Sequence, residues 1–304
     1  MTTTQSDLEN AYQFCQQLAQ SHYENFPVAS VLLPKRLRQP ISVIYAFART
    51  ADNFADEGSE DQKIRLRQLD DYSTALKQIS QQYYQGSNPI FIALEDVIQR
   101  HKLPIPLFED LLSAFEQDVV KNRYANFDEV LDYCIRSANP VGRLLLYLNG
   151  EPNDEQLKQS DAVCTALQLI NFYQDIVQDY TESDRIYIPQ DELSSAGIKE
   201  EDLIQTDSHR IAPLIRSLYQ RTELIMAEGY HLGSYLSGRM GWEVRAMTLG
   251  GITTLNRLMS QNDNALLDRP RLSKLTMLKI LFSSAFKAIY IQSAKQLINV
   301  PKKS

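Results

Sequence analysis

Glycine and proline are scarce in this sequence. It has 11 glycines and 12 prolines in 304 residues, which disfavours folds with many tight turns, such as β-sandwiches and β-barrels. No run of 18 apolar residues occurs, so we expect no transmembrane helix. No stretch alternates between apolar and polar residues for long, whereas most segments repeat apolar residues with a 3.6 period. The sequence therefore predicts an all-α protein.

Cysteine is also scarce. Cys15, Cys134 and Cys164 lie far apart and form no CxxC pair, which argues against a disulfide scaffold or a cysteine metal site. The first residues, MTTTQSDLENAYQFCQQ, are polar and acidic, and they predict neither a signal peptide nor a transit peptide. We expect reduced, buried thiols in a cytoplasmic protein.

Positive charge is in deficit over most of the chain. The net charge of −7 argues against general nucleic-acid binding, and we expect no nucleic-acid partner. The segment 269–304 differs, because it has eight basic residues and no acid. Its apolar residues follow helical spacing, with lysines between them. Two interpretations stay open: a terminal helix packed on the core, or a helix that also makes peripheral contact with an anionic membrane at its inner face.

Helices are predicted along the whole sequence. Ser6 and Glu9 have the spacing of a capping box for the first one. The predicted ranges are 7–21, 40–57, 62–84, 90–102, 107–122, 127–149, 155–180, 211–236, 241–260 and 272–297. Breaks fall at 85–89, 103–106, 149–154 and 188–197, and RIYIP (185–189) is the one extended piece. Without repeats or linkers, the sequence predicts a single domain over 1–304.

A polar stripe interrupts the apolar helix in SVIYAFARTADNFADE. Tyr45, Arg49, Asp52 and Asp56 follow each other at spacings of 4, 3 and 4 residues, which places them on one side of a helix. Like charges one turn apart repel each other by about 0.2–0.5 kcal/mol. A solvated helix face would explain one such stripe, although such a face ordinarily mixes lysine and glutamate.

A second polar stripe lies in LQLINFYQDIVQDY (167–180). Gln168, Asn171, Asp175 and Asp179 are spaced by 3, 4 and 4 residues among apolar neighbours. Two such stripes in one helical chain favour a cation site over two solvated faces. Carboxylate and amide oxygens suit Mg²⁺, which typically bridges carboxylates to a substrate phosphate. We therefore expect several Mg²⁺ ions between two facing helices, holding a diphosphate whose departure they assist.

Most of the chain, in the same order, resembles the squalene/phytoene synthase family. The segments YAFARTADNFADE and NFYQDIVQDY, followed by RIYIP, are similar to the two aspartate-rich motifs of that family. The likeness extends over SHYENFPVASVLLPKRLR (21–38) and RYANFDEVLDYCIRSANPVG (123–142). Within the family, ENFPVAS, SANPVG and NFYQD are most similar to the hydroxysqualene synthases of bacteria.

The resemblance implies a fold and an activity. The fold would be an isoprenoid (terpenoid) synthase fold, a single helical bundle around a central cavity. Presqualene diphosphate would be ionised with Mg²⁺, and the cation would rearrange and be captured by water to give hydroxysqualene. Other enzymes of squalene and hopanoid biosynthesis would supply the substrate and reduce the product. NADPH is not expected, since water ends the reaction and no G-x-G-x-x-G motif follows a strand.

The resemblance also implies roles for individual residues. The metal ligands would be Asp52, Asp56, Asn171, Asp175 and Asp179. The substrate would be contacted by His22, Phe26, Arg49, Gln168, Arg185, Tyr187 and Tyr124. Arg49, Arg185 and Tyr187 would hold the diphosphate, and Arg123 is a further candidate. The catalytic residues would be the four aspartates together with Tyr45 and Asn139. Arg185 follows a polar stretch, which predicts a mobile loop that closes over the leaving group.

Two positions depart from the family pattern. Asn53 stands where the first motif ordinarily has a second aspartate, which removes one charge and is expected to weaken metal binding modestly. Pro140 follows Asn139, and because proline has no N–H it leaves the carbonyl of Arg136 without its helical partner. The Asn139 amide at this kink would then position the attacking water, or the kink would only shape the cavity.

Two other functions stay open. The chain could join two prenyl diphosphates head to head, giving presqualene diphosphate, squalene or phytoene. Turnover of farnesyl diphosphate without added presqualene diphosphate would favour that reaction. A non-catalytic scaffold or assembly homologue is the alternative of another class, and it would bind no Mg²⁺–diphosphate.

Overall fold

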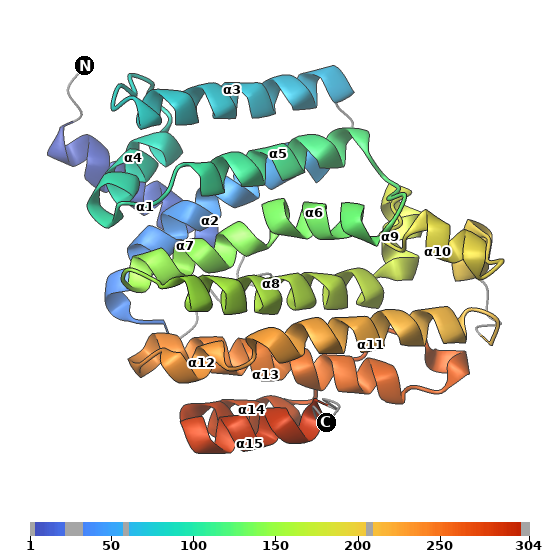
Figure 1. Cartoon of the computed structure of the whole chain (residues 1–304). Coiled ribbons are helices and arrows are strands. Elements are labelled where there is room, and N and C mark those ends of the chain that lie inside the picture. The colour runs from blue at the N-terminus through green and yellow to red at the C-terminus, as the bar shows by residue number, and fades with distance from the viewer. Residues whose placement is uncertain (1–3, 22–32, 57–60, 205–208, 299–304) are drawn as a thin grey trace. The chain divides into compact units, whose positions relative to one another are not determined.

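The computed structural model describes residues 4–21, 33–56, 61–204 and 209–298 (Figure 1). Within these ranges the regular elements are helices. In addition, one isolated parallel β-bridge pairs Arg123 with Ile186. The all-α prediction is therefore confirmed. RIYIP contributes Ile186 to the bridge, in agreement with its extended prediction.

The chain forms two compact units. Unit 1 comprises Met1–Lys121 and Pro140–Pro152, and unit 2 comprises Asn122–Asn139 and Asn153–Ser304. Each unit has its own set of packed helices. The single domain over 1–304 stays a prediction.

Unit 1 is organised around α2. Its helices are α1 (Gln5–Ser21), α2 (Lys35–Asp56), α3 (Gln62–Ser80), α4 (Pro89–His101), α5 (Pro106–Val120) and nearly all of α7 (Asn139–Asn149). The α2 helix packs against α1, α3, α4 and α5. At its centre Phe47 is fully buried, and its ring lies 5.4 Å from Phe108 and 5.7 Å from Tyr72. Burying one such ring stabilises the fold by about 1.5–3 kcal/mol, so the core fixes the rotation of α2 about its axis.

Unit 2 is built on three adjacent helices. Its helices are α6 (Phe127–Ser137), α8 (Asp154–Gln174), α9 (Ile176–Ser183), α10 (Gln190–Ser195), α11 (Ala212–Gly229), α12 (Leu232–Tyr235), α13 (Gly238–Ser260), α14 (Lys274–Ala285) and α15 (Lys287–Leu297), with 3₁₀ turns η2 (Glu200–Ile204) and η3 (Asp263–Ala265). Figure 1 shows α8, α11 and α13 side by side. Two glycines permit this closeness: a Cβ on Gly229 would lie 2.5 Å from the Gln159 carbonyl oxygen, and one on Gly251 would lie 2.4 Å from Leu167.

Four predicted helices are wrong as continuous elements. The ranges 127–149, 155–180, 211–236 and 272–297 each contain two helices. Pro140 explains the first break, since it cannot donate to the preceding turn. In the last, Phe286 has extended backbone, with φ −113° and ψ 119°. The short helix α10 also occupies part of the break predicted at 188–197.

The N-terminal cap of α1 lies earlier than predicted. The Asp7 N–H donates to Thr4 Oγ1 at 3.2 Å, and the Thr4 N–H donates to the Asp7 carboxylate at 3.0 Å. This is the reciprocal pattern of a capping box. The prediction that Ser6 and Glu9 form it is wrong, because the helix already begins at Gln5.

Two further predictions concern the cysteines and membrane-spanning helices. None of the three cysteines, all of which are described, forms a disulfide; Cys15 and Cys134 are buried as predicted, while Cys164 is half-buried and departs from the prediction. Over the described ranges no helix combines the length and apolar character needed to span a membrane.

Candidate active site

The first polar stripe lines a cavity in unit 1. Tyr45, Arg49 and Asp52 project from α2 into a space of 240 Å³. The remainder of the wall is apolar and comes from α2, α5 and α7: Ile41, Ile44, Ala48, Phe115, Val141, Leu144 and Leu145. The sequence therefore correctly placed these three polar residues on one side of α2. The cavity has one charged side and an apolar remainder.

Arg49 and Asp52 form an ion pair within this stripe. Arg49 Nη1 donates to Asp52 Oδ2 at 2.9 Å, and their side chains are 23% and 30% exposed. They are one helical turn apart, the spacing at which opposite charges on a helix meet. The pair gives the cavity both a cation and a carboxylate from a single helix.

Tyr45 stands one turn before Arg49. Burial raises the pKa of its phenol, Arg49 opposes that rise, and Asp52 adds to it. The phenol therefore keeps its proton at neutral pH and is available as a hydrogen-bond donor.

The far end of the first stripe is only partly described. Asp56 is the last residue of α2, and its side chain lies outside the described residues. His22 and Phe26 also lie outside them, so their predicted substrate contacts stay predictions. Asn53 is described: its Oδ1 is buried and has no hydrogen-bond partner within the described ranges.

The second stripe crosses a break between two helices. Asp175 has φ −109° and ψ 14°, which ends α8 and begins α9. The α-helical hydrogen bonds nevertheless continue, from the Asp175 N–H to Asn171 and from the Asp179 N–H to Asp175, at 3.1 and 2.7 Å. Gln168, Asp175 and Asp179 are half-buried, and Asn171 is exposed. The stripe keeps its register although the predicted single helix is interrupted.

Asp175 has an arginine partner that is distant in sequence. Arg269 Nε lies 3.1 Å from Asp175 Oδ1, with exposed side-chain fractions of 59% and 22%. Burial raises the pKa of the Asp175 carboxyl, and Arg269 lowers it. Arg269 was noted in the sequence only as part of the basic segment. No local pattern signals this pairing, because it depends on the folding of unit 2.

Tyr187 lies in an aromatic cluster. Its ring stacks on Phe172 with centroids 3.5 Å apart and an interplanar angle of 8°. Tyr124 stacks on it at 5.4 Å, and Tyr133 lies at 5.8 Å. Tyr124 is fully buried, and Tyr187 is 8% exposed. The cluster therefore fixes the rings of both predicted substrate residues within unit 2.

Arg185 is held between two anchored neighbours. Its Nη1 donates to Tyr187 Oη at 3.4 Å, and its backbone N–H donates to the Asp179 carbonyl at 3.0 Å. The α9 helix continues to Ser183, and only Asp184, with φ 48°, separates it from Arg185. Residues 181–183 are therefore helical and irregular backbone begins at Asp184; that Arg185 sits on a mobile loop that closes over the leaving group stays a prediction.

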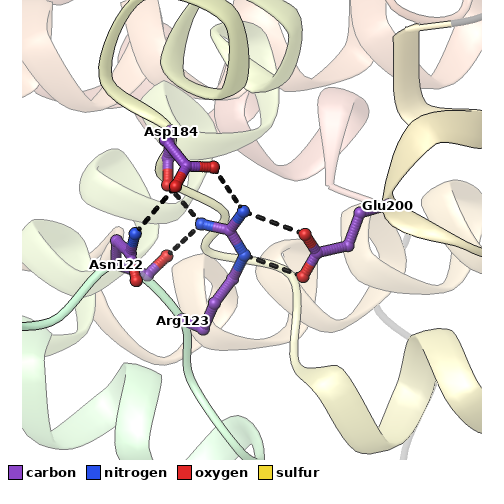
Figure 2. A network of polar contacts seen from close by, with 4 residues as sticks. All are labelled: Asn122, Arg123, Asp184 and Glu200. Carbon is purple, nitrogen blue, oxygen red and sulfur yellow. Dashed lines mark hydrogen bonds and ion pairs between the residues drawn. The ribbon is translucent and has the colours of Figure 1, made fainter.

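Arg123 joins three segments of unit 2 (Figure 2). Its Nε and Nη2 donate to the two carboxylate oxygens of Glu200 at 2.7 and 2.9 Å. Nη2 also donates to the Asp184 carboxylate at 2.6 Å, and Nη1 donates to the carbonyls of Asn122 and Asp184. These five bonds match the five N–H groups of a guanidinium. We call this network the Arg123 clasp; it positions the Asp184–Arg185 segment and leaves Arg123 no donor for a diphosphate.

Asn139 lies at the kink between α6 and α7. It is 5% exposed, and Thr165 Oγ1 of α8 donates to its Oδ1 at 2.9 Å. The helix is interrupted just before Pro140, since α6 ends at Ser137 and α7 begins at Asn139. That Asn139 positions water stays a prediction.

The two stripes carry oxygen donors of the kinds that bind magnesium. Among the side chains described, no three acids, histidines or cysteines gather closely enough to hold a metal ion. The donor types nevertheless fit Mg²⁺. Asp52 and Asp175 are half-buried carboxylates, and the buried Asn53 Oδ1 is an amide oxygen without a partner in the described ranges. The magnesium site stays a prediction.

Several residues of the site were missed in the sequence. Phe115, Val141, Leu144 and Leu145 complete the cavity wall, and Glu200 completes the clasp. The apolar run VGRLLLYL was a usable signal for the α7 wall. Glu200 had none, because it is one acid among several in an acidic turn.

Comparison with known proteins identifies the family of this chain. The sequence model of the squalene/phytoene synthase family matches residues 19–276. A hydroxysqualene synthase from Rhodopseudomonas palustris is 37% identical over 223 residues, which are 73% of this chain and 74% of the relative. A phytoene synthase from Mycobacterium bovis is 28% identical over 232 residues, 75% of this chain and 74% of the relative.

A solved structure has the same fold. The crystal structure of squalene synthase HpnC from Alicyclobacillus acidocaldarius matches with a TM-score of 0.76 and 33% identity, covering 84% of this chain and 95% of that one. The predicted isoprenoid synthase fold is thereby confirmed. The family model also covers both polar stripes. The chain is therefore an enzyme of the squalene/phytoene synthase family.

Proposed function

We propose that this enzyme converts presqualene diphosphate to hydroxysqualene and requires Mg²⁺. The cavity of unit 1 carries the proposal, because Arg49, Asp52 and Tyr45 lie on one side of an otherwise apolar wall. Such a lining suits an isoprenoid diphosphate, which has an anionic head and a hydrocarbon body. The relative named hydroxysqualene synthase, at 37% identity, supports this product.

The charged side of the cavity would receive the diphosphate. Arg49 offers a permanently charged fork of N–H donors, which suits phosphate oxygens. The protonated Tyr45 phenol would donate a hydrogen bond nearby. Bound Mg²⁺ would supply further positive charge that stabilises the leaving group. The residues that would hold it are Asp52, Asp56, Asn171, Asp175 and Asp179.

The apolar side would control how the reaction ends. The C–O bond breaks with its electron pair on the diphosphate, and the carbocation rearranges. A water oxygen then forms a bond to carbon and loses a proton, which gives the alcohol. Phe115, Leu144 and Leu145 exclude water from most of the hydrocarbon, so capture is confined to one part of the cation.

One assay tests this function. The purified enzyme is incubated with presqualene diphosphate and Mg²⁺, with and without NADPH, and the products are identified. We expect hydroxysqualene in equal amount in both reactions and none after chelation of the metal. Squalene formed only with NADPH would contradict the proposal.

Head-to-head joining of prenyl diphosphates is the second candidate. It is favoured by the 28% identity to a phytoene synthase over three quarters of the chain. The same assay with farnesyl or geranylgeranyl diphosphate as the sole substrate distinguishes the two. Release of inorganic diphosphate with a C30 or C40 product would favour this candidate.

A further inference from the structure

The last two described helices expose a concentration of large apolar side chains. Seven of the fifteen exposed large hydrophobic residues in the described ranges lie between 275 and 289. We call them the α14–α15 surface: Leu275, Met277, Leu278, Leu281, Phe282, Phe286 and Ile289. Leu275, Leu278 and Phe282 are 63–64% exposed. Single exposed apolar residues are ordinary, whereas a contiguous group marks an interaction surface.

The opposite side of these helices is firmly packed on unit 2. Ile280 and Ser284 of α14 are buried, and Trp242 Nε1 of α13 donates to Ser284 Oγ and to the Leu281 carbonyl, each at 3.0 Å. On α15, Tyr290 is fully buried and donates to the Tyr230 carbonyl at 2.5 Å. Figure 1 shows both helices lying along α13. The apolar surface therefore belongs to an ordered pair of helices.

The exposed large apolar residues of α14 occupy one side of the helix. At 100° per residue, Leu275, Leu278, Phe282, Leu281 and Met277 cover about 160° of the helix circumference. The buried side, with Ile280 and Ser284, adjoins this arc. Twelve residues span only about 18 Å, against about 30 Å for a bilayer core. The helix is thus shaped to lie on a bilayer and too short to cross it.

The charge around this surface has one sign. Lys274, Lys279, Arg271 and Lys295 are exposed, and the sequence has no acid between 269 and 298. The rest of the chain is acidic, since the net charge is −7. A second copy of the chain docking here would bring these cations together, which is unfavourable. An anionic lipid surface satisfies both the apolar arc and the cations.

We propose that the α14–α15 surface docks the enzyme on an anionic membrane, with the apolar arc of α14 in the boundary between headgroups and acyl chains. Lys279, beside the arc, and Lys274, at its N-terminal end, contact lipid phosphates. This inference is independent of which product the enzyme makes.

Vesicle co-sedimentation of the full chain tests the proposal. Vesicles of phosphatidylcholine are compared with vesicles containing one third phosphatidylglycerol, at low and high salt. Lys274→Gln with Lys279→Gln should lower the partition coefficient on anionic vesicles about 30-fold, about fivefold for each lysine. Leu278→Ser with Phe282→Ser should lower it by about tenfold or more.

Matched controls come from the same unit. Leu224→Ser replaces a leucine that is 52% exposed on α11, and Lys158→Gln replaces an exposed lysine on α8. Both should leave vesicle binding unchanged. Circular dichroism and turnover of soluble substrate should be unchanged in every variant, since the replaced side chains are exposed.

Two results would overturn the proposal. One is binding that is equal on neutral and anionic vesicles and insensitive to both double substitutions. The other is a fall in molecular mass in solution caused by Leu278→Ser with Phe282→Ser, which would identify a second copy of the chain as the occupant.

Discussion

The two polar stripes differ in how their charges are balanced. On α2, Asp52 is paired with Arg49 three residues before it, on an unbroken helix. Asp175 is paired with Arg269, from a distant part of the chain, at the point where α8 gives way to α9. The first stripe is assembled by local sequence, whereas the second requires unit 2 to fold first. A carboxylate can therefore be paired either by a residue one turn away on the same helix or by a residue that only folding brings near.

The largest expected effect tests whether the two stripes serve one reaction. Asp52→Asn and Asp175→Asn each remove a charge with little change of shape. We expect each to lower kcat/KM for presqualene diphosphate by roughly a hundredfold to a thousandfold, as loss of transition-state stabilisation. Circular dichroism spectra of both variants should match the unsubstituted enzyme. Activity lost from only one variant would show that the stripes do not act together.

The two arginines should differ in their importance. Arg49 lines the cavity with a side chain 23% exposed, whereas Arg269 is 59% exposed. Arg49→Gln is expected to lower kcat/KM about a hundredfold, because it removes a predicted diphosphate contact. Arg269→Gln should change it less than about fivefold, as an exposed ion pair contributes about 1 kcal/mol or less. Steady-state kinetics of the two variants checks this, and equal losses would contradict the contrast.

The Arg123 clasp is expected to affect stability more than chemistry. Lysine keeps the charge but cannot donate to Glu200 and Asp184 in the same forked geometry. Since these partners are partly exposed, Arg123→Lys should cost about 1–2 kcal/mol, lowering Tm by about 2–8 °C. Differential scanning calorimetry measures the shift. Arg100→Lys, at an i,i+4 pair with Asp96 on α4 in which the arginine side chain is 61% exposed, is the control and should have little effect. An unchanged Tm in Arg123→Lys would contradict the role of the clasp.

The smallest expected effect is a pH dependence of the same clasp. The Arg123 hydrogen bond lowers the pKa of the Glu200 carboxyl below its ordinary 4.5. The stabilisation is therefore fully present above pH 4.5 and is lost as the pH falls through the lowered pKa. The difference in Tm between the unsubstituted enzyme and Glu200→Gln should narrow as the pH is lowered below 4.5. A difference that stays constant or widens would contradict this assignment.

The sequence pattern correctly predicted those features that depend on one helix alone. The spacing of Tyr45, Arg49 and Asp52 placed them on one side of α2, and the apolar residues around them predicted a buried helix. Most helix positions were predicted for the same reason. The helix breaks at Asp175 and Phe286 were missed. Aspartate is a frequent N-cap residue, but the apolar spacing continues past Asp175, and phenylalanine gives no local signal of a break.

The remaining parts of the site depend on contacts between distant residues. Arg123 meets Glu200 from 77 positions away. The resemblance to the family suggested Arg123 as a further candidate for holding the diphosphate. Only the fold shows that its donors are already in use. Stacking of Tyr187 on Phe172 likewise joins residues 15 positions apart, and no local pattern signals it.

The anchoring of Arg185 has a consequence for the rate at which the site can change. Asp184 is held by Arg123 on one side, and Tyr187 is stacked on Phe172 on the other. With both neighbours fixed, the guanidinium changes position by rotation about side-chain bonds rather than by displacement of the backbone. Side-chain rotations take picoseconds to nanoseconds, whereas collective backbone motions that close a site take microseconds to milliseconds. Turning the Arg185 guanidinium toward a bound anion would then not have to wait for a slower motion of the backbone.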